Sequence, residues 1–214
     1  MPEPEFPERF FEREDETPDS LFYGEPRFVA HIDDETISAL TAYYREFLPS
    51  GSRVLDLMSS WISHLPDDAY ARVSGLGMNE RELAANPRLT DAVVHDLNVD
   101  PRLPYEDAAF ERAVIAVSIQ YLVRPMEVFR DLVRVLVPGG RVAIAMSHRC
   151  FPTKAILAFR ALGPRDRVRL VSTYLHQAGF VDIAFEDRSP PRADPLWIVA
   201  GTRPLPDPDV RDDH

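Results

Sequence analysis

The sequence predicts an α/β domain built on a doubly wound sheet that is mostly parallel and ends in an antiparallel C-terminal strand pair. Short β-branched runs alternate along the chain with segments of helical periodicity. The runs are nearly continuous in apolar character, which is typical of parallel strands buried on both faces. The last two runs follow one another without a helix between them, and this favours an antiparallel final pair.

Charge and composition narrow the possible partners. The chain has 24 basic and 35 acidic residues among 214, giving a net charge of −11. Such a surface repels nucleic acid and anionic lipid, so neither is an expected partner. No apolar run approaches the ~20 residues that cross a bilayer. One cysteine and no segment resembling a signal peptide predict a cytoplasmic protein.

The ends of the chain differ in composition from its middle. Residues 1–20 combine prolines and carboxylates with only three phenylalanines as possible anchors, and we predict a flexible acidic arm that is either mobile or loosely docked. Residues 204–214 repeat this composition and are predicted to be a disordered tail. The single domain is therefore expected to span residues 21–203.

The first helix is predicted to follow Asp33 and Asp34, either of which can cap it, and to end before Pro49. Its apolar face is formed by Ile37, Leu40, Tyr44, Phe47 and Leu48. Strands are then expected at 54–57, at 93–94 and at 114–117. A further strand is expected to end at Gly77.

The second half contains two clear helices. One is predicted over 126–136, ended by Pro138-Gly139-Gly140 before a strand at 142–145. The other has its apolar stripe over 168–178 and stops at Gly179. Strands at 181–185 and 196–200, joined by a proline-rich turn, complete the sheet.

In sheets of this kind, ligands bind beyond the carboxyl ends of the strands near the switch point. This rule directs attention to the segments 56–61, 75–79, 96–98 and 118–121. Neither the dinucleotide fingerprint nor the phosphate loop is present in the sequence. A nucleoside with a small charged appendage is therefore favoured over NAD or ATP.

Residues 95–147 resemble the later motifs of class I S-adenosylmethionine-dependent methyltransferases, type 11-like. The resemblance rests on an aspartate, Asp96, followed by the stretch LPYEDAAFERAV and, at the family's spacing, by RVLVPGG at 134–140. The order of expected strands and helices matches that of the family from Arg53 to Arg203. The sequence also resembles a bacterial and plant subgroup that carries LDLMSSW in place of the glycine-rich loop. The resemblance implies a Rossmann-like methyltransferase sheet with S-adenosylmethionine as cofactor.

The first loop departs from the family pattern. Met58, Ser59, Ser60 and Trp61 stand where most relatives have glycines that approach the methionyl group. The serine hydroxyls can donate to a carboxylate, while Trp61 either caps the site or fills core. Asp56 has two open interpretations, since it can hold the loop or the ligand's amino group, or cap backbone amides.

The end of the second strand departs as well. Gly77 stands where the family places an acid that accepts both ribose hydroxyls. The Asn79 amide oxygen is a candidate replacement, and Met78 falls where an apolar side chain packs on adenine. Alternatively, Gly77 is only a turn and Asn79 only a helix cap.

At the third strand, the resemblance implies that Asp96 accepts from the exocyclic amine and that the Leu97 amide reaches a ring nitrogen. The alternative is that Asp96 is an ordinary loop carboxylate. The complete set of predicted cofactor residues is Asp56, Met58, Ser59, Ser60, Gly77, Met78, Asn79, Asp96, Leu97 and Ser118.

The methyl acceptor is expected over the ends of the fourth and fifth strands. The residues nominated for it are Tyr121, Arg149, Phe151 and Lys154, with Tyr23, Arg27 and His31 from a lid. Arg149 and Lys154 suit an anionic small molecule, or they form surface ion pairs. The lid itself, 21–31, has an alternative as a strap that packs Phe22, Phe28 and Ile32 on the sheet's flank.

The remaining candidates carry little chemistry. Cys150 lies beside cations, but neighbours in sequence do not establish a catalytic dyad. The six histidines lack metal-site spacing, so no metal is predicted. No catalytic base is assigned.

The predicted function is methyl transfer to a small-molecule acceptor, and the alternative is a non-catalytic binding or interaction module on the same fold. The oligomeric state is left open.

Overall fold

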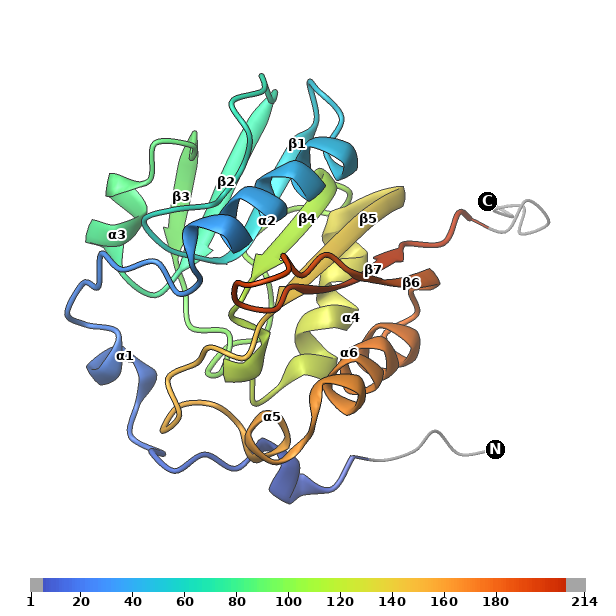
Figure 1. The fold of residues 1–214 in the computed structure, drawn as a ribbon. Helices are drawn as coiled ribbons and strands as arrows, with labels where there is room; N and C mark the ends of the chain where they lie inside the picture. Colours follow the sequence, from blue (N-terminus) through green and yellow to red (C-terminus); the bar gives the residue numbers. More distant parts are fainter. Residues whose placement is uncertain (1–5, 207–214) are drawn as a thin grey trace.

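A computed structural model describes residues 6–206 of the protein (Figure 1). Its centre is a seven-stranded sheet in the order β3-β2-β1-β4-β5-β7-β6. The strands are β1 (Arg53–Ser59), β2 (Arg72–Gly77), β3 (Asp91–Val94), β4 (Phe110–Ala116), β5 (Leu136–Met146), β6 (Val181–Asp187) and β7 (Trp197–Thr202). The first five pair in parallel, whereas β7 runs antiparallel to both β5 and β6. The predicted α/β class and antiparallel C-terminal pair are confirmed.

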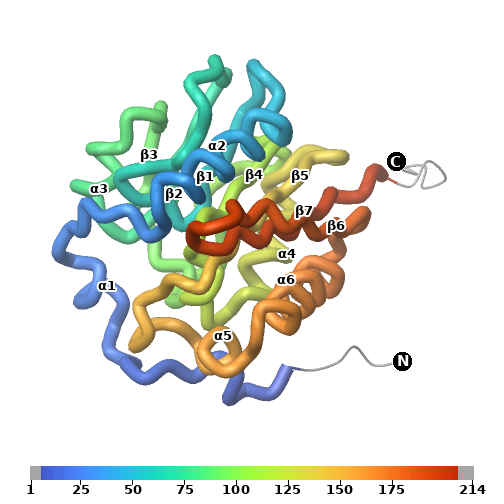
Figure 2. Tube along the Cα trace, viewed as in Figure 1, coloured from blue at the N-terminus to red at the C-terminus, as the bar shows by residue number. Residues whose placement is uncertain are grey.

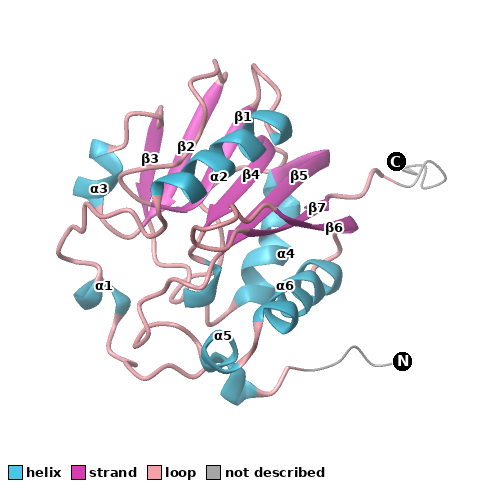
Figure 3. Ribbon diagram, in the orientation of Figure 1, coloured by secondary structure: helices cyan, strands magenta, loops and turns pink. Residues whose placement is uncertain are grey.

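Helices cover both faces of this sheet (Figure 3). The longer ones are α2 (Asp34–Phe47), α4 (Pro125–Val135) and α6 (Pro164–Gln177). Short helices are η1 (Glu8–Phe11), α1 (Asp19–Phe22), α3 (Glu80–Ala85), η2 (Ile119–Tyr121) and α5 (Leu157–Ala161). No helix in the described part of the chain is long and apolar enough to cross a membrane.

The two faces have separate cores because side chains alternate along each strand. On β1, Leu55 and Leu57 join the cluster formed with α4 and α6. Val54 points the other way and joins the cluster formed with α2. As predicted, α2 begins after Asp33, whose carboxylate accepts from Thr36 N at 2.9 Å. The helix therefore brings the chain to β1 with its apolar face already against the sheet.

Two strand predictions need correction. The strand β3 is not buried on both faces, since it lies at the sheet edge and Val94 is 53% exposed. The sequence Pro138-Gly139-Gly140 does not end α4, which stops at Val135, but lies inside β5. Pro138 excludes helix at the residues just before it, and Gly139 adopts a φ of +76° where β5 is irregular.

The described part of the predicted N-terminal arm is packed against the domain. Figure 2 shows it passing α5 and continuing along one side of the molecule toward α2. Phe6 stacks edge-on against Tyr174 with ring centroids 5.0 Å apart, and Phe10 and Phe11 contact the same core. Composition left open a mobile or a loosely docked arm, and the described residues are docked, through partners of the phenylalanines that lie far away in sequence. Residues 1–5 and 207–214 of the predicted termini lie outside the described residues, and the boundaries of the domain stay a prediction.

Candidate functional site

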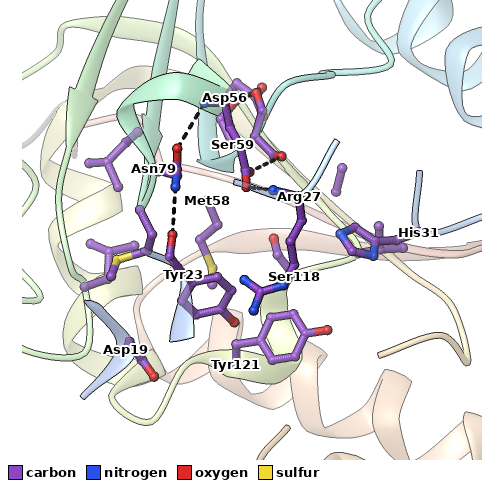
Figure 4. Close-up of a pocket in the computed structure, with 18 of the residues that line it drawn as sticks. Asp19, Tyr23, Arg27, His31, Asp56, Met58, Ser59, Asn79, Ser118 and Tyr121 are labelled. Atoms are coloured by element: carbon purple, nitrogen blue, oxygen red, sulfur yellow. Dashed lines mark hydrogen bonds between the residues drawn. The ribbon is translucent and has the colours of Figure 1, made fainter. Parts of the chain in front are cut away.

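A cavity opens at the carboxyl ends of β1, β2, β3 and β4, enclosing about 1090 Å³ together with its solvent-filled mouth. Ten residues predicted for a cofactor line it: Asp56, Met58, Ser59, Ser60, Gly77, Met78, Asn79, Asp96, Leu97 and Ser118. Five of those predicted for the acceptor also do, namely Tyr23, Arg27, His31, Tyr121 and Phe151. Figure 4 shows how several of these side chains converge.

Arg149 and Lys154 do not line this cavity. Arg149 is 58% exposed and pairs with Asp194 at 3.0 Å. Lys154 is fully buried, and its ammonium donates to the Thr17 carbonyl at 2.6 Å and lies 3.3 Å from Asp15 and Asp19. The expectation of a cationic pair for an anionic acceptor is therefore wrong in its placement. Lys154 instead anchors the N-terminal residues, a contact that no local sequence pattern predicts.

The covering segment, residues 21–31, forms one wall of the cavity. The Arg27 backbone N–H donates to Glu82 Oε1 at 2.6 Å, and its guanidinium donates to the Phe22 carbonyl at 2.6 Å. In Figure 4 the Arg27 side chain extends toward Tyr121. The flank-strap alternative is met only by the adjoining Ile32, which is buried in the core under α2. Phe28 is half-exposed and contacts Trp61.

Asp56 holds the first loop through side-chain hydrogen bonds. Its Oδ2 accepts from Ser59 Oγ and Ser63 Oγ, both at 2.5 Å. Asn86 donates in turn to Ser63 Oγ and to the Ser60 carbonyl, both at 2.8 Å. Burial raises the pKa of Asp56 to about 6, although the two serine hydroxyls favour the ionised form. Serine side chains thus order this loop, which stands where the family resemblance predicts glycines.

Gly77 is required by the close approach of this loop. A Cβ at Gly77 would lie 2.3 Å from the Ser59 carbonyl oxygen, far inside contact distance. Met58, at the first glycine position of the loop, has a φ of +59°, which a side chain rarely adopts. The loop therefore lies against the end of β2 and leaves no room there for an acidic side chain.

Asn79 is a helix cap, and the prediction that it replaces the lost ribose acceptor is not supported by its contacts. Its Oδ1 accepts from the backbone of Arg81 and Glu82, at 3.0 and 3.2 Å. Its Nδ2 donates to the carbonyls of Tyr23 and Gly24. All of its hydrogen-bonding capacity is used in joining α3 to the covering segment.

Glu82 is a cavity residue that the sequence analysis missed. Its carboxylate lines the cavity, and Oε2 accepts from Ser60 Oγ at 2.6 Å. The available signal was its spacing: Glu82 lies three residues after the cap Asn79, in the first turn of α3. A side chain there projects beyond the carboxyl end of β2, where Gly77 offers none.

Asp96 and Asn98 organise the end of β3. Asp96 Oδ1 accepts from the Asn98 backbone at 2.9 Å, so the carboxylate closes a turn and also lines the cavity. Asn98 Nδ2 donates to Asp19 Oδ2 at 2.8 Å and to the Tyr121 carbonyl at 2.9 Å. Both carboxylate oxygens of Asp19 accept from Arg13 Nη1, at 2.7 and 2.9 Å. The same network therefore joins the cavity wall to the N-terminal residues.

The described residues contain neither an activated cysteine in the cavity nor a metal site. Cys150 does not line the cavity, and burial raises the pKa of its thiol in spite of Arg167 and Arg160. Between residues 6 and 206, no group of three or more His, Cys, Asp or Glu side chains is arranged to hold a metal ion.

Residues 58–144 match the sequence model of a methyltransferase domain family. This segment is therefore similar to a methyltransferase domain, as expected from residues 95–147. Methyltransferase GfsG from Streptomyces halstedii is 31% identical over 113 residues, which are 48% of this chain and 40% of that relative. The chain thus spans well under half the length of the curated relative it matches.

The chain also resembles solved structures. The cyclase SpnF superposes with a TM-score of 0.62 at 18% identity, covering 87% of this chain and 92% of SpnF. An S-adenosylmethionine-dependent methyltransferase from Mesorhizobium loti superposes with a TM-score of 0.56 at 20% identity, covering 77% and 98%. At these identities the likeness shows the fold alone.

The cavity is chemically suited to S-adenosylmethionine. Two carboxylates, Glu82 and Asp96, provide acceptors for hydroxyl and amino groups, and Arg27 provides a cation for a carboxylate. Ser118 Oγ is buried and has no hydrogen-bond partner among the described residues, so a ligand atom can satisfy it. The residues present therefore fit a zwitterionic nucleoside.

Proposed function

We propose that the protein is an S-adenosylmethionine-dependent methyltransferase that acts on a small-molecule acceptor. The observation that carries the proposal is the gathering of Asp96, Glu82 and Arg27 around one cavity at the carboxyl ends of the central strands. The methyltransferase family match supports the reaction class. The covering segment, which walls the cavity, favours a small acceptor over a macromolecule.

Each end of the cofactor has a proposed partner. Asp96 accepts from the adenine amine and the Leu97 backbone reaches a ring nitrogen. Glu82 accepts from the ribose hydroxyls in place of the acid that the Ser59 carbonyl excludes at Gly77. Arg27 pairs with the methionyl carboxylate in place of the amides of a glycine-rich loop.

When bound, S-adenosylmethionine supplies a methyl group on a sulfonium centre. The protein's own task is to orient the acceptor in line with that group and to exclude water. Asp56 and its two serine partners keep the first loop in one conformation. The covering segment, held by Glu82 and Asn79, closes the remaining side.

The decisive experiment is calorimetry with S-adenosylhomocysteine, S-adenosylmethionine and NADH. We expect the two sulfur compounds to bind and NADH not to bind. Asp96→Ala removes a hydrogen bond to a charged group and should weaken binding by ~1.5–3 kcal/mol. Absence of binding up to millimolar ligand by the folded protein contradicts the proposal. Binding without methyl transfer to any acceptor would instead favour a non-catalytic binding module.

A further inference from the structure

Two histidines in the cavity are not used by the cofactor residues proposed above. His31 comes from the covering segment and His64 from the end of the first loop, and both line the cavity. His64 is only 8% exposed, and its Nδ1 is buried without a partner among residues 6–206. Its backbone is held at a φ of +56°, where its carbonyl accepts from Thr41 Oγ1 at 2.9 Å.

The His31 ring belongs to an aromatic wall. It packs edge-on against Phe151 with centroids 5.0 Å apart, and Phe151 lies 5.9 Å from the Tyr121 ring. The Phe151 backbone N–H donates to Tyr121 Oη at 2.8 Å, which fixes this wall. Such a surface fits a flat or compact apolar skeleton.

Both imidazoles are neutral near pH 7. Burial, with the nearby His31 acting in the same direction, lowers the pKa of His64 to about 4. Burial also lowers the pKa of His31, with Arg27 acting in the same sense and Glu82 acting against it. His31 is consequently the stronger base of the two, because a carboxylate favours its protonated form.

The mouth of the cavity beside His31 is apolar. Phe28 and Val29 are 50% and 51% exposed, and the Phe28 ring packs against Trp61 at 6.2 Å. Trp61 Nε1 donates to the Val29 carbonyl at 3.1 Å, so the first loop and the covering segment form one continuous rim. Exposed apolar residues of this kind are characteristic of the entrance to a ligand-binding site.

We propose that His31 and His64 mark the subsite of the methyl acceptor, a proposal that rests on the methyl transfer proposed above. The subsite takes a neutral apolar alcohol or phenol. His31 receives the proton of its hydroxyl group. An anionic acceptor finds neither Arg149 nor Lys154 there, since both are engaged elsewhere. An ammonium acceptor meets neutral imidazoles, and the remaining acceptor capacity of Glu82, beside its bonds from Ser60 and Arg27, is assigned above to the ribose hydroxyls.

The methyl group passes from sulfur to the acceptor oxygen in a single displacement. A lone pair on the acceptor oxygen forms the new O–CH₃ bond while the S–CH₃ bond breaks and its electron pair stays on sulfur. The sulfonium becomes a thioether, and the oxygen becomes an ether when its proton passes to the His31 imidazole. That proton then leaves to solvent as the product dissociates, returning His31 to its neutral form.

The test uses three probes with one skeleton and different charges: 2-naphthol, 2-naphthoate and 2-naphthylmethylammonium. Their affinities are measured by calorimetry on the full chain saturated with S-adenosylhomocysteine. We expect 2-naphthol to bind at least 10-fold more tightly than either charged probe. His31→Phe preserves the ring packing on Phe151 but removes the proton acceptor. With S-adenosylmethionine, this variant should form the naphthyl methyl ether ~100-fold more slowly.

Further measurements separate proton transfer from a structural effect. The wild-type rate should rise with pH through an apparent pKa below 6.5, and this rise should be absent in His31→Phe. Exogenous imidazole should restore part of the rate to His31→Ala. His176→Phe, on the exposed face of α6, is the matched control and should leave every value unchanged.

The outcomes distinguish the two proposals. If S-adenosylhomocysteine does not bind, the proposed function fails. If it binds but none of the three probes does, or a charged probe binds more tightly than 2-naphthol, the acceptor class is wrong. An unchanged rate in His31→Phe overturns the assignment of the proton acceptor, even where the affinity for 2-naphthol is retained.

Discussion

Glu82 illustrates how a lost side chain is replaced from a different element. The Ser59 carbonyl excludes a Cβ at Gly77, while the Glu82 carboxylate reaches the same cavity from α3. We predict that Glu82→Gln weakens S-adenosylhomocysteine binding roughly 10- to 150-fold, because a charge-assisted bond is worth ~1.5–3 kcal/mol. Glu80→Gln, an exposed change in the same helical turn, is the control. Equal dissociation constants in a titration of both variants would remove Glu82 from the site.

Asp56 should make stability depend on pH. Its pKa is about 6 in the folded protein and close to 3.8 when unfolded, so the folded state holds the proton more tightly. The free energy of unfolding should therefore fall as pH rises from about 4 to 6, by on the order of 2–3 kcal/mol. Urea unfolding of wild type and Asp56→Asn across this range isolates the effect. A parallel pH dependence in the two proteins would contradict it.

Residue roles were predictable only where a backbone rule applied. The Asp33 cap and the position of Asp96 at a strand end follow from local sequence. The use of Asn79 was one of two open possibilities, because capping and ligand binding both suit an amide after a strand. Glu82 and the buried Lys154 were not assigned these roles, since their partners lie in segments that only the folded chain brings near.

Among the elements, the N-terminal residues depend most on tertiary contacts. Lys154 on the loop before α5 is fully buried between Asp15, Thr17 and Asp19. We predict that Lys154→Met destabilises the protein by ~3–5 kcal/mol, because it removes a cationic partner from the buried carboxylate of Asp19. Limited trypsin digestion should then cut faster at Arg13 and Arg27. Arg169→Met, at an 81% exposed position on α6, should behave as wild type.

Regular elements were predicted well where periodicity is unambiguous, as in α2, α4 and α6. The sequence pattern failed where position in the sheet decides the outcome: β3 has an apolar sequence but lies at an edge. For residues 6–20 it left open a mobile or a loosely docked arm. Three phenylalanines, the buried Lys154 and backbone hydrogen bonds to Thr153 and Leu157 hold that segment on the domain.

At the scale of the whole molecule, the cavity is built from distant parts of the chain. The covering segment, the first loop, α3 and the end of β4 all contribute to its wall. A ligand bound there should stabilise the native state as one unit, by ~2.7 kcal/mol at one hundred times its dissociation constant. For a domain of this size we expect S-adenosylhomocysteine to raise the Tm by roughly 5–10 °C. Differential scanning calorimetry with NADH in parallel should show no comparable shift.

The contact between the Ser59 carbonyl and Gly77 also has an evolutionary consequence. A single substitution that restores an acid at position 77 would collide with the loop, and glycines introduced into the loop alone would discard the serine bonds to Asp56 and Glu82. Either change made alone would disrupt the site. An acidic side chain at position 77 therefore requires a simultaneous change in the backbone of the loop at Ser59.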